Sequence, residues 1–272
     1  MPYAATRLGR WFYEERGTPR RPGDPAVVLW PSLLCDGGMF RHQIEPLSAL
    51  GRVLVFDGPG HGKSDVPPPF TLEDNAAALV DAFEALGVER AIVVGLSWGG
   101  MLGMRLALAH PARVGALALL DTSADAERPA RAVKYRLFVS LARRVGMPPA
   151  LVERQIVPLF FADGTRRDRP ELVERFVRAA NGFPKEGLAR AALAVVVHRT
   201  SILDRLRAVR APTLVLCGRE DSATELERSE RIAQRIPGAQ LVVIEGAGHL
   251  SALERPQQVN EALVPFVAAN LG

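Results

Sequence analysis

A serine in this chain occurs in a local pattern that is suited to acyl transfer. Ser97 stands between Gly95 and Gly99 in a G-x-S-x-G arrangement, with a β-branched run before it and an alanine- and leucine-rich segment after it. This arrangement places a serine at the apex of a tight strand-to-helix turn, so that its hydroxyl projects above a sheet. The glycines are needed because the strand and helix backbones pass close together there. The pattern therefore predicts that Ser97 is a nucleophile.

A serine hydroxyl needs a general base and a third group that orients this base. His249 lies in the glycine-bearing segment 245–250, and Asp221 lies in the segment 218–222. Each of these segments directly follows a predicted strand, as Ser97 does. In a parallel sheet such positions line a single crevice. We therefore expect His249 to act as the base and Asp221 to orient it.

Two other residues in the sequence could supply the carboxylate that orients His249. Glu220 is adjacent to Asp221, and Asp121 follows another predicted strand. Asp221 is preferred because its strand directly precedes the strand of His249 in the sequence, which gives the order serine, aspartate, histidine that hydrolases of this kind show.

Acyl transfer also requires two hydrogen-bond donors aimed at the oxygen that gains negative charge. The backbone N–H of Trp98, the residue after the nucleophile, is the first expected donor. The second should come from the loop after the apolar run 26–30. Leu33 is the expected residue there, and Leu34 is the alternative.

The elements that must position these residues alternate between strand-like and helix-like patterns. Short, wholly apolar runs indicate strands of a parallel sheet that is covered on both faces, and the helical patterns between them indicate crossover connections. Residues 3–16 carry the pattern of a hairpin. The predicted apolar strands are 26–30, 52–56, 91–94, 114–120, 213–217 and 240–244.

The alternation stops between residues 124 and 207. This stretch shows no convincing strand but four helical patterns, at 129–145, 149–160, 170–180 and 185–197, while the arginine-rich segment 165–169 is expected to be a solvated loop. Four consecutive helices within an α/β pattern indicate an insertion. We therefore predict a core formed by 1–123 and 208–272, and an inserted helical cap formed by 124–207.

The composition excludes several classes of function. The chain has 272 residues, 48% hydrophobic and 24% charged, with a net charge of +4. Dense basic clusters with interleaved aromatic residues do not occur in the sequence, so nucleic acid is not an expected partner. The apolar runs are too short to span a membrane. Two cysteines, Cys35 and Cys217, give no disulfide framework. These features predict a soluble, cytoplasmic protein, and they leave its oligomeric state open.

The sequence also gives no sign of a metal or a cofactor. The histidines outside the predicted site show no metal-ligand spacing. The glycine-rich segment 58–64 does not have the spacing of a phosphate-binding loop, and Pro59 removes one of its amides. We expect a small-molecule substrate and no cofactor.

Taken together, the motifs of this chain resemble those of the α/β-hydrolase fold superfamily, in its cap-bearing branch. The resemblance is carried by the segments 95–100, 57–64, 217–221, 246–249 and 254–256. It implies that the inserted helices form a lid over the site. Where many members have His-Gly, this chain has Pro31-Ser32, and the segment 31–34 is closer to the Asn-Ser-Leu-Gly of 3-oxoadipate enol-lactonases. The segment 121–123 is also similar to that subgroup.

The expected activity is that of a serine hydrolase acting on an ester or a lactone, with a mostly apolar pocket. Apolar lid residues support this pocket: Phe138, Phe160, Phe161 and Phe176. Carbon–carbon bond hydrolases and cofactor-free perhydrolases use the same three residues, so both stand as alternatives. A further alternative is a hydrolase-fold receptor that binds a ligand without turnover.

Overall fold

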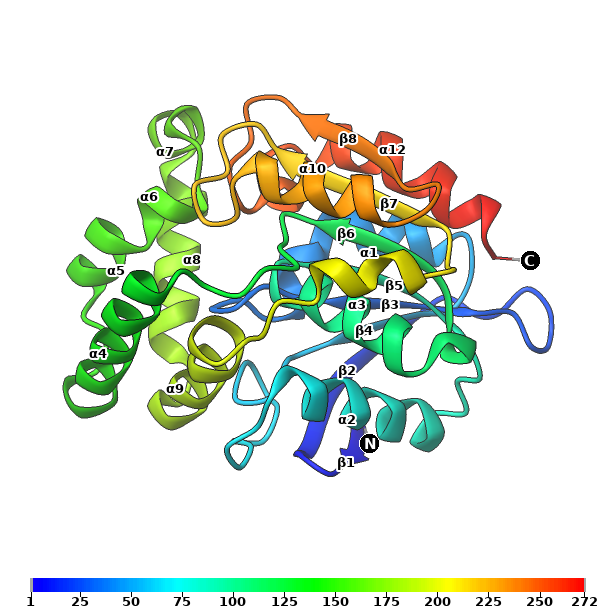
Figure 1. Ribbon diagram of the computed structural model, residues 1–272, viewed down its shortest axis with the longest axis horizontal. Coiled ribbons are helices and arrows are strands. Elements are labelled where there is room, and N and C mark those ends of the chain that lie inside the picture. The colour runs from blue at the N-terminus through cyan, green and yellow to red at the C-terminus, as the bar shows by residue number, and fades with distance from the viewer. Residues whose placement is uncertain (1, 272) are drawn as a thin grey trace.

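The apolar runs of the sequence form the centre of an eight-stranded sheet in the computed structural model, which describes residues 2–271 (Figure 1). The strand order is β1-β2-β4-β3-β5-β6-β7-β8. The hairpin β1–β2 is antiparallel and pairs antiparallel with β4, whereas the strands from β4 to β8 are parallel. The strands are β1 (Tyr3–Thr6), β2 (Gly9–Arg16), β3 (Ala26–Trp30), β4 (Val53–Phe56), β5 (Ala91–Leu96), β6 (Val114–Leu120), β7 (Thr213–Gly218) and β8 (Gln240–Ile244).

Helices cover both faces of this sheet, as the wholly apolar strands predict. Alternate residues of β3 belong to different cores: Val28 to the core that also contains residues of α2, α3 and α10, and Val27 and Leu29 to the core that contains residues of α1, α11 and α12. Burial on both faces is why these strands carry almost no polar residue. The core helices are α1 (Arg41–Ser48), α2 (Leu72–Ala85), α3 (Trp98–Ala109), α10 (Leu226–Arg235), α11 (Ser251–Glu254) and α12 (Pro256–Ala269), and the short 3-10 helices are η1 (Gly37–Phe40), η2 (Pro111–Arg113) and η4 (Leu203–Ala208).

The start of α2 shows how local sequence sets an element boundary. The hydroxyl of Thr71 accepts the N–H of Asp74 at 3.1 Å, and the carboxylate of Asp74 accepts the N–H of Thr71 at 2.9 Å. This capping box satisfies two backbone donors that a helix start leaves without partners. The helix ends before Gly87, whose φ of 63° suits glycine.

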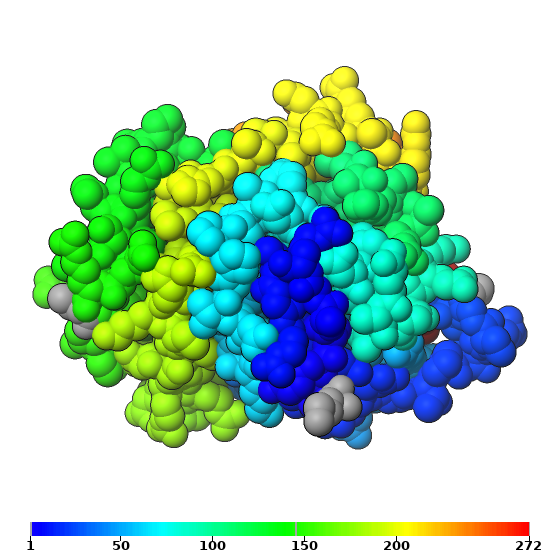
Figure 2. All heavy atoms as spheres, turned by 90° about the horizontal axis from the view of Figure 1, so that it is seen from below, coloured from blue at the N-terminus to red at the C-terminus, as the bar shows by residue number. Residues whose placement is uncertain are grey.

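A second group of helices connects β6 to β7 and gathers at one end of the molecule (Figures 1 and 2). In Figure 2 these helices, in green and yellow-green, lie on the left, and the N-terminal strands, in dark blue, lie near the centre of the visible face. The helices are α4 (Pro129–Val145), α5 (Pro149–Gln155), α6 (Val157–Phe160), α7 (Asp163–Asp168), α8 (Pro170–Gly182) and α9 (Lys185–Ala192), followed by the π-helical turn η3 (Leu193–Val197).

Two predictions within this group are wrong. The helix predicted over 149–160 is broken at Ile156, because Pro158 has no N–H to donate to the preceding turn. The arginine-rich segment expected to be a loop lies in α7. There, Asp163 stands in the first turn, where a negative charge is favourable, and pairs with Arg166 three residues later.

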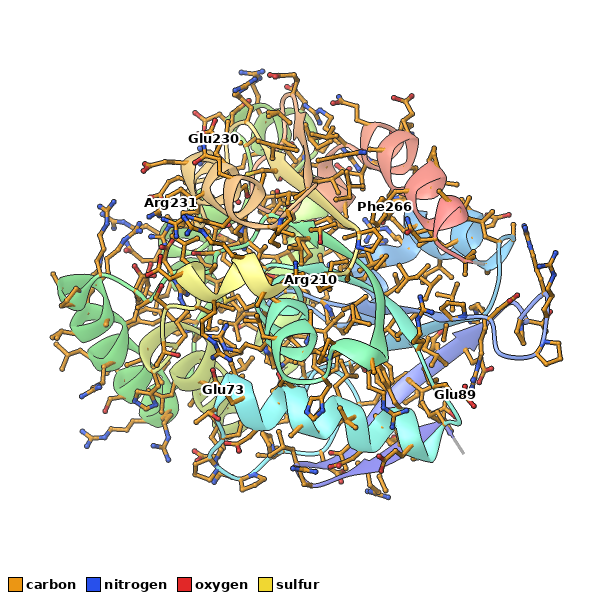
Figure 3. The ribbon with its side chains drawn as sticks, turned by 45° about the vertical axis from the view of Figure 1, so that its right-hand side comes forward. Glu73, Glu89, Arg210, Glu230, Arg231 and Phe266 are labelled. Carbon is orange, nitrogen blue, oxygen red and sulfur yellow. The ribbon has the colours of Figure 1, made fainter. Side chains whose placement is uncertain are left out.

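The charged residues of the core helices lie mainly on the outside. Glu73 on α2 and Glu230 on α10 are examples in Figure 3, and Glu89 in the loop before β5 is exposed as well. Among the described residues, no helix is both long enough and apolar enough to cross a membrane.

Candidate active site

Ser97 occupies a turn of a single residue between β5 and α3. Its φ of 55° and ψ of −104° lie outside the usual regions, which is the strained backbone that a strand-to-helix elbow imposes. A Cβ on Gly95 would lie 2.1 Å from the carbonyl carbon of Gly99, and a Cβ on Gly99 would lie 2.2 Å from the oxygen of Trp30. The two glycines are therefore required by the close approach of strand and helix.

The backbone of Ser97 is fixed from both sides. Its N–H donates to the oxygen of Leu120 on β6 at 2.8 Å, and the hydroxyl of Thr122 donates to its carbonyl oxygen at 2.6 Å. The strand β5 extends to Leu96, two residues beyond the predicted end, so the elbow is tighter than the sequence indicated. With its backbone anchored, the side chain of Ser97 faces a cavity that His249 also lines.

The imidazole of His249 is paired with the carboxylate of Asp221. The Nδ1–H of His249 donates to Oδ2 of Asp221 at 2.9 Å, and the hydroxyl of Thr224 donates to the same oxygen at 2.8 Å. The other oxygen of Asp221 accepts the N–H groups of Ala223 and Thr224. Four donors thus fix the carboxylate, and the carboxylate in turn fixes the tautomer of the imidazole that leaves Nε2 as the acceptor.

The electrostatic environment of His249 favours its action as a general base. Burial disfavours the charged imidazolium, but the negative charges of Asp221, Asp121 and Glu254 outweigh burial and raise the pKa of His249 above its usual value. An imidazole with a raised pKa accepts a proton from a hydroxyl more readily, because its protonated form is stabilised.

The two alternative acids are placed differently. Glu220 is exposed to solvent. Asp121 is buried, but its Oδ1 accepts the N–H of Gly218 at 2.8 Å and its Oδ2 accepts the hydroxyl of Ser251 at 2.5 Å. Asp121 therefore ties the end of β7 to the segment that follows His249. Burial and the nearby charge of Asp221 raise the pKa of Asp121.

The loop expected to supply the second oxyanion donor is held by His61. The N–H of Leu34 donates to Nε2 of His61 at 3.2 Å, and Nδ1 of His61 lies 3.2 Å from the oxygen of Pro59. Because the N–H of Leu34 already has this acceptor, Leu33 is the better candidate of the two. Burial lowers the pKa of His61 to about 4, so the ring is neutral at neutral pH and Nε2 can accept.

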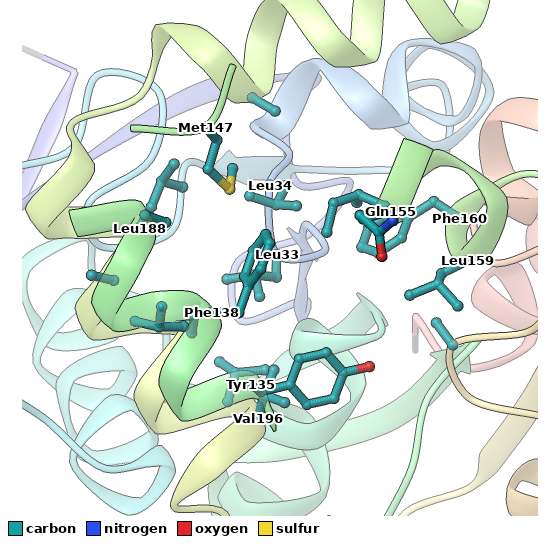
Figure 4. A pocket seen from close by; sticks show the side chains of 18 of the residues that line it. Leu33, Leu34, Tyr135, Phe138, Met147, Gln155, Leu159, Phe160, Leu188 and Val196 are labelled. Atoms are coloured by element: carbon teal, nitrogen blue, oxygen red, sulfur yellow. The ribbon is translucent and has the colours of Figure 1, made fainter. Parts of the chain in front are cut away.

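The cavity above Ser97 has a volume of about 430 Å³ and a mainly apolar wall (Figure 4). Helices α4, α5 and α6 and the segment from α8 to η3 supply most of this wall, while Leu33 and Leu34 come from the loop after β3. Trp98 is not among the lining residues, and its indole N–H donates to Asn75. The apolar residues labelled in the close view are Leu33, Leu34, Phe138, Met147, Leu159, Phe160, Leu188 and Val196.

A buried charged cluster borders one side of the cavity. Arg199 donates to Glu127 at 3.0 Å and to the backbone oxygens of Asp125 and Val195, so its guanidinium is engaged on several sides. Arg228 lies 3.7 Å from the same Glu127. Sequence reasoning missed this cluster, because its members come from separate segments with no shared motif.

Two buried acids and a cysteine lie close together near the ends of β6 and β7. Ligand atoms of Asp121, Cys217 and Asp221 lie within 4.8 Å of one another. However, both carboxylates are occupied by the donors described above, and burial raises the pKa of the Cys217 thiol. Burial likewise raises the pKa of Cys35, so this thiol is a filler of the core and not a reactive group.

A parallel sheet that presents a serine, a histidine and a carboxylate at the ends of its strands defines the α/β-hydrolase class of proteins. The comparison with known families agrees: the model described as "alpha/beta hydrolase fold" matches residues 25–256. The chain belongs to this family.

Similar proteins are named as hydrolases. A putative carbamate hydrolase, RutD, from a Caulobacter species is 30% identical over 94% of this chain and 95% of its own length. The structure of a thermophilic esterase from Thermogutta terrifontis, with malate bound, has a TM-score of 0.91 and 31% identity over 99% of this chain and 98% of that one. The enol-lactonase from Burkholderia xenovorans has a TM-score of 0.88 and 30% identity over 98% and 99%.

Proposed function

We propose that this protein is a serine hydrolase that cleaves an ester or a lactone with an apolar acyl or alcohol group. The observation that carries the proposal is the buried pair of His249 and Asp221, 2.9 Å apart, which opens onto the same cavity as the strained Ser97. In this mechanism Ser97 attacks the carbonyl carbon while Nε2 of His249 takes its proton. The histidine then returns the proton to the leaving alkoxide.

The negative charge of the tetrahedral intermediate needs two donors. We assign the N–H of Trp98 and the N–H of Leu33 to this task. Trp98 is the first residue of α3, so its N–H also lies at the positive end of a helix dipole. A water molecule activated by His249 then attacks the acyl-enzyme and releases the acid. This sequence of steps requires neither a metal nor a cofactor.

We further propose that residues 124–207 act as a cap on a core made of 1–123 and 208–272. The helices of this segment supply most of the cavity wall, and the core supplies Ser97 and His249. The two parts meet closely: a Cβ on Gly60 of the core would lie 2.6 Å from the Cα of Gly187 on α9. Selectivity for the substrate would then reside in the cap.

The wall of the cavity favours an uncharged substrate. Its buried cation, Arg199, is already paired with Glu127, and Lys134 and Lys185 are exposed to solvent. A carboxylate on the substrate, as in a lactone of 3-oxoadipate, would therefore find no buried cation that lacks an acidic partner among the described residues that line this cavity. The same machinery can attack a carbamate carbonyl, but the size of the apolar wall suits a larger acyl group.

A labelling experiment tests the proposal. A fluorophosphonate probe should label the folded protein, and Ser97→Ala should abolish labelling while leaving the melting temperature unchanged within a few degrees. Absence of labelling in the wild-type protein would refute the serine hydrolase assignment and favour a receptor. Turnover of p-nitrophenyl esters, simple lactones and ring-cleavage diketones then separates an ester or lactone hydrolase from a carbon–carbon bond hydrolase. Halide oxidation with peroxide tests the perhydrolase.

A further inference from the structure

Glu254, the last residue of α11, holds the backbone on both sides of the histidine. Its Oε1 accepts the N–H of Gly248 at 2.9 Å and the N–H of Leu250 at 3.3 Å. These two residues flank His249 in the chain. The carboxylate is buried, with 1% of Glu254 exposed, so this is a solvent-excluded contact and not a surface one. One oxygen of Glu254 therefore fixes the loop that carries the imidazole.

The other oxygen of Glu254 reaches a distant part of the chain. Oε2 accepts the N–H of Ala162 at 2.9 Å, in the linker between α6 and α7. The linker lies directly on the histidine loop, because a Cβ on Gly248 would be 2.6 Å from the nitrogen of Ala162. The adjacent Phe160 packs edge-on against the imidazole of His249, with ring centroids 5.0 Å apart. The same carboxylate thus joins the helical segment to the histidine loop.

An ionised carboxylate at Glu254 satisfies its backbone donors in a way that a neutral amide of the same shape would not. Three N–H groups converge on two oxygens, and an acceptor-only carboxylate can satisfy all of them. An amide in the same place would turn an NH₂ group toward one of these donors and leave that donor without an acceptor.

We propose that Glu254 is a positioning residue that couples the linker at Ala162 to His249 and so sets the orientation of the imidazole in the proposed hydrolase site. The inference rests on the proposed function for its kinetic consequence. The coupling itself is a structural property that is measurable without turnover. If the coupling holds, a substitution at Ala162 changes the position of His249, although the two residues lie in different elements.

Two substitutions break the coupling from opposite ends. Glu254→Gln keeps the volume of the side chain and removes its charge. Ala162→Pro removes the N–H donor. Its dihedral angles suit proline, because Ala162 has φ −59° and the preceding Phe161 is extended, with φ −126° and ψ 138°. The ring Cδ would take the place of the donated hydrogen and push Oε2 of Glu254 away, which also breaks the contact. Glu261→Gln on the exposed side of α12 is the matched control for the loss of a carboxylate.

We expect each of the first two variants to lower kcat on an activated ester by about tenfold to a hundredfold, with KM changed less than threefold, because misplacing a catalytic group acts on the transition state. The double variant should be little worse than the worse single variant, since both act through one contact. Glu261→Gln should match the wild type. Additive losses in the double variant, or unchanged kcat in Glu254→Gln, would overturn the proposal.

The pH dependence of fluorophosphonate labelling separates positioning from simple loss of stability. Glu254 is one of three carboxylates near His249, with Asp221 and Asp121, and its charge favours the imidazolium. Glu254→Gln should therefore shift the acidic limb of the labelling profile to lower pH, and Ala162→Pro should shift it less. A lower melting temperature with no shift in Glu254→Gln would mean that the residue is only structural.

Amide hydrogen exchange gives a readout that needs no activity. Glu254→Gln and Ala162→Pro should both speed exchange at Gly248 and Leu250 by at least tenfold, and Glu261→Gln should not. If exchange at these amides does not respond to Ala162→Pro, the coupling is absent, whatever the labelling result. If exchange responds but the wild-type protein is not labelled at Ser97, the coupling stands and the serine hydrolase assignment fails.

Discussion

Asp221 holds His249 by a hydrogen bond of 2.9 Å, and both side chains are buried. The carboxylate is itself held by the hydroxyl of Thr224 and by two backbone N–H groups that follow it in the chain. Asp121 makes none of these contacts, and it binds Gly218 and Ser251 instead. Of the two buried acids, Asp221 is therefore the one placed to orient the imidazole, and Asp121 is placed to hold the two loops together.

Substitution of each acid by asparagine distinguishes these roles. Asp221→Asn should lower kcat by about 10²–10⁴, because the imidazole loses the group that fixes its tautomer. Asp121→Asn should lower kcat less than about tenfold, because the hydrogen bond from His249 to Asp221 stays in place. Steady-state turnover of an activated ester measures both, with thermal melting as the control for folding. The reverse ranking would identify Asp121 as the acid.

Asp121 should make the stability of the protein depend on pH. Burial and repulsion by Asp221 raise the pKa of Asp121 to about 8, so the folded state binds a proton that the unfolded state releases near pH 4. The stabilisation of the folded state by this proton is fully present below the pKa of the unfolded state, and it is lost as the pH rises to about 8. Asp121→Asn does not titrate. Its melting temperature, relative to the wild type, should therefore rise by several degrees between pH 5 and pH 8.5. A constant difference over this range contradicts the prediction.

The sequence predicted those parts of the site that local geometry dictates. Gly95 and Gly99 identify the elbow because their backbones approach too closely for any side chain. Asp221 and His249 follow from the position of their segments after strands of a parallel sheet. The elbow depends on a few neighbouring residues, so a single sequence reveals it, whereas the roles of Asp221 and His249 remain predictions that rest on the order of the strands.

The features that the sequence did not predict depend on contacts between distant segments. The contact of Glu254 with Ala162 joins a core helix to a linker that has no motif. The role of Asp121 depends on Ser251, which lies far along the chain. The break at Ile156 had a local cause in Pro158, but the apolar periodicity across it concealed the break. Pattern reasoning fails where packing, and not periodicity, decides the structure.

His61 should influence turnover although it does not contact the nucleophile. It accepts the N–H of Leu34, and its ring packs between Trp98 and Phe183 at centroid distances of 5.3 and 5.1 Å. His61→Phe keeps an aromatic ring in this place but removes the acceptor. The N–H of Leu34 then loses its partner, and the loop that carries Leu33 shifts.

We expect His61→Phe to lower kcat by about tenfold to a hundredfold, less than the complete loss of an oxyanion donor. His198→Phe is the control, because this histidine is exposed. The pKa of His61, about 4, places its titration below the working range, so the size of the effect should be the same at pH 6 and pH 8. An effect confined to one of these values would mean that His61 titrates and takes part in proton transfer.

The length of the acyl group that the cavity accepts should change when its wall is altered. Ala142 on α4 lines the cavity and is half-buried, so a phenylalanine there would occupy part of its volume of about 430 Å³. Ala130 on the same helix is exposed and does not line the cavity, which makes Ala130→Phe a matched control.

If Ala142→Phe prevents the burial of two methylene groups of the acyl chain, the transition state should lose about 1.6 kcal/mol of stabilisation, at roughly 0.8 kcal/mol for each methylene. This corresponds to about a fifteenfold loss in kcat/KM for p-nitrophenyl decanoate. Turnover of p-nitrophenyl acetate should stay within about twofold, because a short acyl group does not reach α4. The ratio of the two kcat/KM values, measured in both variants, is the decisive quantity. Equal losses on both esters in Ala142→Phe, or an unchanged ratio, would mean that the acyl group binds elsewhere and that α4 does not determine selectivity.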